Sequence, residues 1–190
     1  MEQEAYFGEI QSGHLEQVGY DTYCNLLDEV VKEMKGIEVK EEVEIQIDLD
    51  VTSYIPDEYI SDSNQKIEVY QNIALCRSEE DIQNVIDEVI DRFGNIPEEL
   101  ENLIAIARIK YLSKEKNITK IASKKTMDKK EAVVFTFEQN KFEIDIHELV
   151  KRYGNKIKFS AGIKPMITLE IGMTGEKEIL NAVTEFIKSM

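Results

Sequence analysis

The sequence predicts a domain of the α+β class: a helical lead-in, a three-helix segment and a small mixed or antiparallel sheet packed with helices. Helical periodicity dominates residues 18–34 and 64–116, whereas short runs typical of strands occur at residues 43–51 and again after residue 117. A strand followed by helices, and then by mixed strands and helices, is the order of an α+β fold. We expect residues 1–36 to form a separate helical lead-in and residues 37–190 to form the domain.

The lead-in is expected to contain one helix. Apolar residues recur at helical spacing between Val18 and Met34, and Gly36 follows the run. The apolar stripe of this helix includes Tyr23, Leu26, Leu27, Val30 and Val31. Away from a longer protein the stripe would be exposed to water, so we expect the lead-in either to fold back or to form a homodimer with a second copy.

Residues 43–51, "VEIQIDLDV", alternate strictly between apolar and polar side chains. This pattern predicts a half-buried strand whose outer face is acidic. Asp48 and Asp50 share that outer face, and paired carboxylates are potential ligands of a divalent cation. Because no third oxygen ligand is in view, a solvated face is the simpler interpretation, and no metal site is expected.

Three helices are expected next, at about residues 64–76, 78–93 and 97–116. Ser78 is suited to cap the second helix, Gly94 to end it, and Pro97 to stand in the first turn of the third. The third helix is apolar almost all round and is expected to be the central buried helix. The second has an apolar stripe, Ile82, Val85, Ile86, Val89, Ile90 and Phe93, and a polar side, Asn84, Asp87, Glu88 and Asp91.

The last third of the chain changes character. Short runs predict strands at residues 118–123, 132–138, 156–160 and 166–171, and helical spacing predicts helices at about 146–153 and 177–187.

The formal net charge is −15, which argues against a surface that binds nucleic acid over its whole extent. The charge is uneven: residues 37–62 contain nine acids and one base, and residues 110–131 contain eight lysines and three acids. Two solvated faces account for this, but a nucleic-acid contact stays open as an alternative function. It would use Lys110, Lys114, Lys116, Lys120, Lys124, Lys125, Lys129 and Lys130.

Motifs of catalysis and cofactor binding are not found in the sequence. There is no phosphate-binding "GK[ST]" loop and no "GxSxG" nucleophile motif. His14 and His147 belong to no metal or triad pattern, and His147 is interpreted as a helix surface or boundary residue. Cys24 and Cys76 are expected to be buried packing thiols. We therefore expect an interaction domain with no catalytic residue and no cofactor, and a hydrolase using Asp and Glu pairs is the remaining alternative.

Neither a signal peptide nor an apolar run long enough to cross a bilayer is evident, so we expect a cytoplasmic protein.

Several motifs occur in a fixed order: "QSGH" with "VGYDTY", then "YIPDEYI", a tyrosine in the next helix, and "DRFG" followed by proline. With them, most of residues 7–121 resembles the C-terminal region of the bacterial transcription-repair coupling factors. This resemblance implies a fragment of a large DNA translocase of the helicase type that removes stalled RNA polymerase from damaged DNA and recruits the repair protein UvrA. ATP and Mg²⁺ are implied for the full-length protein only.

The resemblance also assigns roles to residues. Gln11, Ser12 and Gly13 would be the remnant of a translocation motif at the end of the motor lobe. The domain after residue 36 would dock on an N-terminal UvrB-like module of the same protein and mask its UvrA-binding surface. Glu88 and Asp91 would form the docking contact with basic residues of that module, although pairing of Asp91 with Arg92, or simple solvation, stays open. This chain departs from the resemblance at one place: Gln71 and Asn72 occupy the two positions after the tyrosine of "IEVY", where a basic pair is expected.

Overall fold

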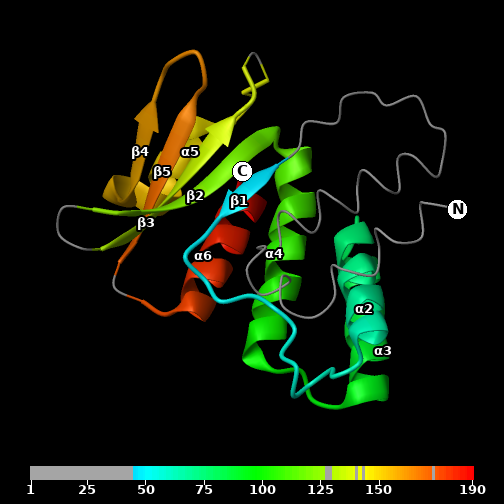
Figure 1. Ribbon diagram of the computed structural model, residues 1–190. Helices are drawn as coiled ribbons and strands as arrows, with labels where there is room; N and C mark the ends of the chain where they lie inside the picture. The colour runs from blue at the N-terminus through cyan, green and yellow to red at the C-terminus, as the bar shows by residue number, and fades with distance from the viewer. Residues whose placement is uncertain (1–44, 127–129, 140, 143, 173) are drawn as a thin grey trace, which may run out of the picture.

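The computed structural model describes residues 45–126, 130–139, 141–142, 144–172 and 174–190, and it confirms the α+β class (Figure 1). A five-stranded mixed sheet stands beside helices α4 and α6, and helices α2 and α3 lie on the far side of α4 from the sheet (Figure 1). The expected boundary after residue 36, the apolar stripe of the lead-in, Cys24 and the three residues of the translocation motif all lie outside the described residues.

The sheet has the strand order β1-β2-β3-β5-β4. Its strands are β1 Gln46–Asp48, β2 Ile118–Lys125, β3 Glu131–Phe137, β4 Ile157–Ser160 and β5 Met166–Gly172. The first strand pairs with β2 in parallel, and all other pairs are antiparallel. The sheet is therefore mixed, and β1 and β4 are its two edges.

Of the predicted strand at residues 43–51, the structure describes residues 45–51, and within these the strand is shorter than expected. Ladder pairing covers only Gln46–Asp48, because the backbone N–H of Asp50 donates to the hydroxyl of Ser123 at 2.9 Å rather than continuing the ladder. The alternation itself is confirmed over the described residues. Ile45 and Ile47 are buried and Leu49 and Val51 pack against the core, whereas Gln46, Asp48 and Asp50 are exposed.

The helices are α2 Ser63–Leu75, α3 Glu79–Phe93, α4 Glu98–Glu115, α5 Ile146–Tyr153 and α6 Glu176–Lys188, with the short 3₁₀ turn η1 Gly154–Lys156 after α5. All five helices lie within two residues of their predicted bounds. The position of Pro97 was predicted wrongly: its ψ of 158° is extended, so it precedes α4 and the first turn begins at Glu98.

Helix α4 separates two hydrophobic clusters. Ile106 and Ile109 belong to the cluster beneath the sheet, which also holds Phe135, Phe137 and Phe186. On the other side, α4 contributes to a cluster with α2 and α3 through Leu100, Leu103, Ile104 and Ala107. The prediction of a central buried helix is confirmed. Helix α4 has apolar residues on most sides because it packs into both hydrophobic clusters.

A polar junction around the buried Asn102 ties the connection after β1 to two helices. The side-chain amide of Asn102 on α4 donates to the carbonyl oxygen of Thr52 at 2.9 Å and to the carboxylate of Glu176 on α6 at 3.1 Å. Thr52 in turn donates to the same carboxylate from its backbone N–H and its hydroxyl. Asn102 is only 3% exposed, and these bonds offset the free-energy cost of removing its side-chain amide from water.

None of the helices in the described part combines the length and apolar character that a membrane span requires.

Candidate functional site

Helix α3 begins at a well-defined cap. Ser78 is extended, and its hydroxyl accepts from the backbone N–H of Asp81 at 3.1 Å. The carboxylate of Asp81 accepts a hydrogen bond at 2.9 Å from the N–H of Arg77, the residue before the cap, an arrangement related to a capping box but shifted by one residue. The bond from Arg77 holds the pKa of the Asp81 carboxyl below its ordinary value. The predicted cap is confirmed.

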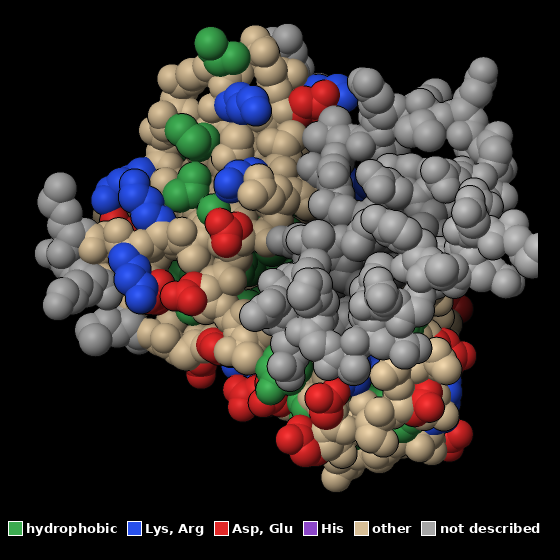
Figure 2. Space-filling model, in the orientation of Figure 1, with side chains coloured by type: hydrophobic (Ala, Val, Ile, Leu, Met, Phe, Trp, Pro, Cys, Tyr) green, Lys and Arg blue, Asp and Glu red, His purple; other side chains and the backbone are tan. Residues whose placement is uncertain are grey.

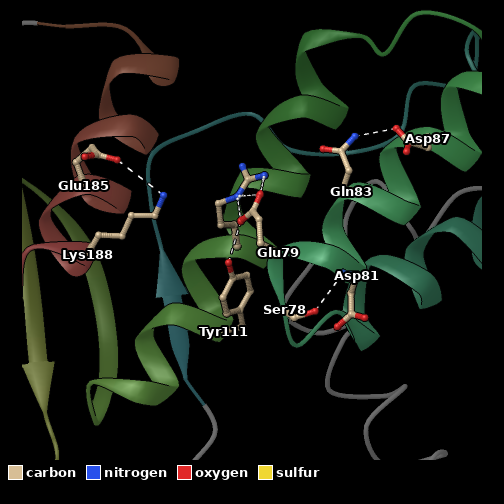
Figure 3. Close-up of polar contacts among 9 residues, drawn as sticks. Ser78, Glu79, Asp81, Gln83, Asp87, Tyr111, Glu185 and Lys188 are labelled. Atoms are coloured by element: carbon tan, nitrogen blue, oxygen red, sulfur yellow. Dashed lines mark hydrogen bonds and ion pairs between the residues drawn. The ribbon is translucent and has the colours of Figure 1, made fainter.

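The first turn of α3 is also fixed to α4. Arg108 grips the carboxylate of Glu79 through two nitrogens, with Nε 2.8 Å from Oε2 and Nη2 2.5 Å from Oε1. The hydroxyl of Tyr111 donates to the same carboxylate at 2.8 Å (Figure 3). The bond from Arg108 lowers the pKa of Glu79, and burial, with the nearby carboxylate, raises the pKa of Tyr111 to about 12.

The C-terminal end of α3 is fixed by Gly94. Its φ of +88° lies in the region that favours glycine, and its N–H donates to the carbonyl of Ile90 at 2.9 Å. The hydroxyl of Tyr59 donates to the carbonyl of Gly94 at 2.7 Å, and the ring of Tyr59 packs on Phe93. Hydrogen bonds therefore fix both ends of α3, so the position of its outer face relative to α4 and the preceding loop is well defined.

The outer face of α3 is the candidate docking surface. Asn84, Asp87, Glu88 and Asp91 are all exposed on it, as the sequence predicts. Glu88 and Asp91 are three residues apart and hence neighbours on the helix. Seen from one side, acidic side chains gather along the end of the molecule formed by the helices, and basic side chains lie mainly over the sheet (Figure 2).

Arg92 organises one flank of the docking surface. Its guanidinium donates to Glu88 at 2.7 Å and to Glu68 on α2 at 3.0 Å, and it lies over the ring of Phe93. The two carboxylates, with Glu68 first, raise the pKa of Arg92. The pairing of Asp91 with Arg92 that the sequence left open is not made: Arg92 pairs with Glu88 and Glu68, and Asp91 has no ion-pair partner within the described ranges. Sequence reasoning missed Glu68, because nothing in its spacing links it to a residue 24 positions away.

The apolar stripe of α3 is narrower than predicted. Ile82, Val85 and Val89 are buried and Ile86 and Phe93 are half-buried, but Ile90 is 46% exposed. Ile90 lies three residues from Asp87, at the margin of the stripe, where neither α2 nor α4 covers it. The prediction for Ile90 was wrong, and the docking surface has an apolar residue at its border.

The other candidate residues are distributed differently. Asp48 and Asp50 are exposed, with Lys125 at 3.8 Å from Asp50, and no cluster of three or more metal-ligating side chains occurs among the described residues. Of the lysine-rich stretch, Lys110, Lys116 and Lys120 are half-buried, and Lys125 lies between Asp50 and Glu131. Lys129 lies outside the described residues. Acids therefore neutralise part of this surface.

Two further predictions are confirmed. Cys76 is 5% exposed, and burial raises the pKa of its thiol to about 11, as expected of a packing residue. His147 is an exposed residue in the first turn of α5. Gln71 is exposed on α2 and Asn72 is half-buried there.

Comparison with known proteins decides the family. The family model of the TRCF domain matches residues 49–149. The chain belongs to the TRCF domain family. The match covers α2, α3 and α4, and thus the whole candidate docking surface on α3.

Curated relatives agree with the family. The transcription-repair-coupling factor of Bacillus subtilis (strain 168) is 33% identical over 189 residues, which cover 96% of this chain and 16% of that protein. The corresponding protein of Staphylococcus haemolyticus (strain JCSC1435) is 37% identical over 121 residues, 62% of this chain and 10% of the relative. The TRCF chain thus spans only a small part of the length of these relatives.

A solved structure shows the same fold. The crystal structure of the C-terminal domain of a transcription-repair coupling factor superposes with a TM-score of 0.66 at 21% identity, covering 77% of this chain and 92% of that one. The resemblance found in the sequence motifs is therefore confirmed for family and fold.

Proposed function

We propose that this TRCF domain is a non-catalytic regulatory domain that docks, through Glu88 and Asp91 on α3, on a UvrB-like module of the longer protein to which it belongs. In the docked state it would cover the surface of that module that binds UvrA. The observation that carries the proposal is the exposure of both carboxylates on one face of a helix whose two ends are anchored.

The charges of the surface favour a basic partner. Asp91 is free to accept a new ion pair, since it has none within the part of the chain that the structure describes. Glu88 is 43% exposed at its side chain but already bonded to Arg92, so a basic group of the partner must share or displace that bond. Exposed ion pairs contribute only about 0–1 kcal/mol each. A contact built on them is weak and reversible.

Weak docking suits a mask that must be removed. If the docked and undocked states differ by a few kcal/mol, a rearrangement elsewhere in the longer protein can shift the population between them. We assign the ATP- and Mg²⁺-dependent translocation on DNA, and the contact with RNA polymerase, to other parts of the longer protein. Under this proposal the described domain holds no cofactor and contributes control rather than chemistry.

The test is a titration of this chain against the isolated UvrB-like module. The double variant Glu88→Ala, Asp91→Ala is compared with the wild type at low and at moderate salt. A matched control, Glu148→Ala with Glu185→Ala, removes two exposed acids from α5 and α6, each of which has a lysine partner on its own helix. We expect about tenfold weaker binding for the α3 variant, about 1.4 kcal/mol, and unchanged binding for the control.

A competition step separates docking from masking. UvrA is added to the complex, and wild-type domain is expected to reduce UvrA binding in proportion to the docked fraction. Equal binding of the two double variants would move the interface away from α3. Undiminished UvrA binding at concentrations where the module is saturated with the domain would contradict the mask.

Pairing of two copies through residues 1–36 stays a separate prediction, and sedimentation velocity at several concentrations tests it.

A further inference from the structure

Strand β4 is an open edge of the sheet. It pairs with β5 over four residues, from Ile157 opposite Leu169 to Ser160 opposite Met166, and the described part of the chain supplies no strand on its other side. Backbone N–H and C=O groups point alternately to the two sides of a strand, so half of those on β4 face away from β5. Figure 1 shows β4 at the end of the sheet opposite β1.

Exposed apolar side chains are concentrated around this edge. Of the eight large hydrophobic residues exposed in the described part of the chain, five lie within residues 146–166. They are Ile146, Val150, Phe159, Ile163 and Met166. Ile146 and Val150 continue the apolar stripe of α5, whose Leu149 joins the core beneath β4 and β5. Such a concentration of exposed apolar residues within one short segment that includes a free edge strand is more than scattered surface apolar residues require.

The same segment is basic within an acidic protein. Residues 146–164 contain five lysine or arginine residues and one acid, whereas the whole chain has a net charge of −15. Lys158 pairs with Glu170 and Lys151 with Glu148. Lys156 and Lys164 have no carboxylate within ion-pair distance among the described residues, nor has Arg152 on α5, which lies over the ring of Tyr153, so positive charge remains in this segment.

The alternation of β4 defines the pattern of a matching strand. Ile157 and Phe159 lie opposite the buried Leu169 and Ile167, on the face of the sheet that the helices cover. Lys158 and Ser160 lie on the other face. A strand added beside β4 would therefore bring apolar residues next to Phe159 and acidic residues next to Lys158, which is the favourable cross-strand pairing.

A second copy of the chain does not meet these requirements. Pairing two β4 edges would bring Lys156, Lys158 and Lys164 of one copy close to those of the other, and like charges across a strand pair are destabilising. Lysine on edge strands is a common protection against such self-association. The same lysines that would repel a second β4 edge would attract a strand with acidic side chains.

We propose that the β4 edge, meaning β4 with the five apolar and three unpaired basic residues named above, accepts an extended segment of another protein as a sixth strand. The segment alternates apolar with acidic residues, so that backbone bonds supply affinity and the two side-chain rows supply selectivity. This surface is formed by α5, β4 and β5 and does not use α3, so it is independent of the docking function proposed above.

The experiment uses a fluorescent nine-residue peptide, VEVEVEVEV, titrated into the full chain, with ¹⁵N amide shifts read in parallel. Two control peptides are VKVKVKVKV and a VEVEVEVEV peptide methylated at alternate backbone nitrogens. We expect the acidic peptide to bind at least about tenfold more tightly than either control. The amide shifts should concentrate at Ile157–Ser160.

Protein variants locate the contact. Lys156→Glu with Lys164→Glu should weaken binding of the acidic peptide about tenfold, whereas Lys124→Glu with Lys130→Glu, the same charge change on β2 and the turn after it, should leave it unchanged. The double variant of α3 should also bind the peptide normally.

Several results would overturn the proposal. Equal affinity for the methylated peptide would mean attraction by charge without strand addition, and no binding up to about 1 mM would mean no site of useful affinity. Concentration-dependent shifts at β4 without peptide would identify a second copy as the occupant. Oligothymidylate that shifts the same amides more strongly than the peptide would identify a nucleic-acid surface.

Discussion

The amide of Asn102 on α4 donates to the carboxylate of Glu176 in the first turn of α6 across 3.1 Å. These residues are 74 positions apart, and the same amide also bonds the carbonyl of Thr52. The junction holds the segment after β1 against both helices. The amide of Asn102 is costly to leave without partners, because this side chain is only 3% exposed, whereas Thr52 is exposed and Glu176 half-buried.

Replacing Asn102 by leucine should lower the free energy of unfolding by about 1–3 kcal/mol, because Glu176 and the carbonyl of Thr52 lose a buried donor. Urea denaturation followed by circular dichroism measures the change. Asn181→Leu, at an exposed position of α6, is the matched control and should stay within about 0.5 kcal/mol. Equal effects at the two positions would mean that the junction does not stabilise the fold.

Two isoleucines of α3 should differ sharply in their contribution to stability. Ile82 is 1% exposed and Ile90 is 46% exposed. We expect Ile82→Ala to cost about 2–5 kcal/mol and Ile90→Ala to cost less than about 1 kcal/mol, since only the first leaves a cavity. Thermal and urea unfolding of the two variants provides the comparison. Similar losses would indicate that Ile90 is covered in solution.

The ion pair of Glu79 with Arg108 should make stability depend on acid pH. Arg108 lowers the pKa of Glu79 in the folded state, so the stabilisation is complete above the ordinary pKa of 4.5 and is lost as pH falls through the lower folded value. The side chain is 55% exposed, so the effect should not exceed about 1 kcal/mol.

Stability measured between pH 6 and 3 (roughly the range over which carboxylates titrate) checks this expectation. The difference between wild type and Glu79→Gln should shrink as the pH falls. Glu80→Gln, next in sequence and without an ion-pair partner in the described ranges, should show no such trend. A difference that stays constant with pH would contradict a contribution from the ionised carboxylate.

Cys76 should affect stability at the alkaline end. Burial raises the pKa of its thiol to about 11, so between about pH 9 and 11 the unfolded chain ionises the thiol and the folded chain does not. Stability should therefore fall with pH in this range, and less steeply in Cys76→Ala. In a Cys24→Ala background, a thiol reagent at pH 8 should react slowly with the folded protein and rapidly in urea. Rapid reaction without urea would show that the thiol is accessible.

The lysine-rich stretch should bind DNA poorly. Asp50 and Glu131 lie near Lys125, and three of the lysines are half-buried, so few charges are available to phosphates. We expect little retention of the chain on a DNA column at 0.1 M salt, roughly the concentration at which screening acts over 10 Å. Strong retention that falls steeply with salt, and that is lost in the double variant Lys124→Glu, Lys130→Glu, would instead support the alternative of a nucleic-acid contact.

Local chemistry explains which parts of the fold could be predicted from the sequence. Ser78 and Gly94 mark the ends of α3 because a hydroxyl cap and a positive φ are requirements of the helix itself. The apolar residues on most sides of α4 predict that the helix is buried, but they do not predict which elements pack against it. The parallel pairing of β1 with β2 has no such local signal, since it joins residues more than 70 positions apart.

In the candidate site, too, local sequence predicts some features, and others depend on how the helices pack. Exposure of Glu88 and Asp91 follows from helical spacing alone. The bond from Arg92 to Glu68 depends on how α2 lies against α3, and the exposure of Ile90 depends on how much of the stripe α2 and α4 cover. The junction at Asn102 joins residues 50 and 74 positions apart, so the sequence of α4 alone gave no sign of it.

The sharing of α4 between two cores limits how the domain can move. Swinging α2 and α3 away from α4 would expose Leu100, Leu103, Ile104 and Ala107 to water, at a cost of several kcal/mol, roughly 1.5–3 for each large side chain. The α3 surface therefore cannot be presented or withdrawn by rearrangement within the domain. If the domain docks as proposed, the change that controls docking would therefore be a displacement of the whole domain rather than a rearrangement within it.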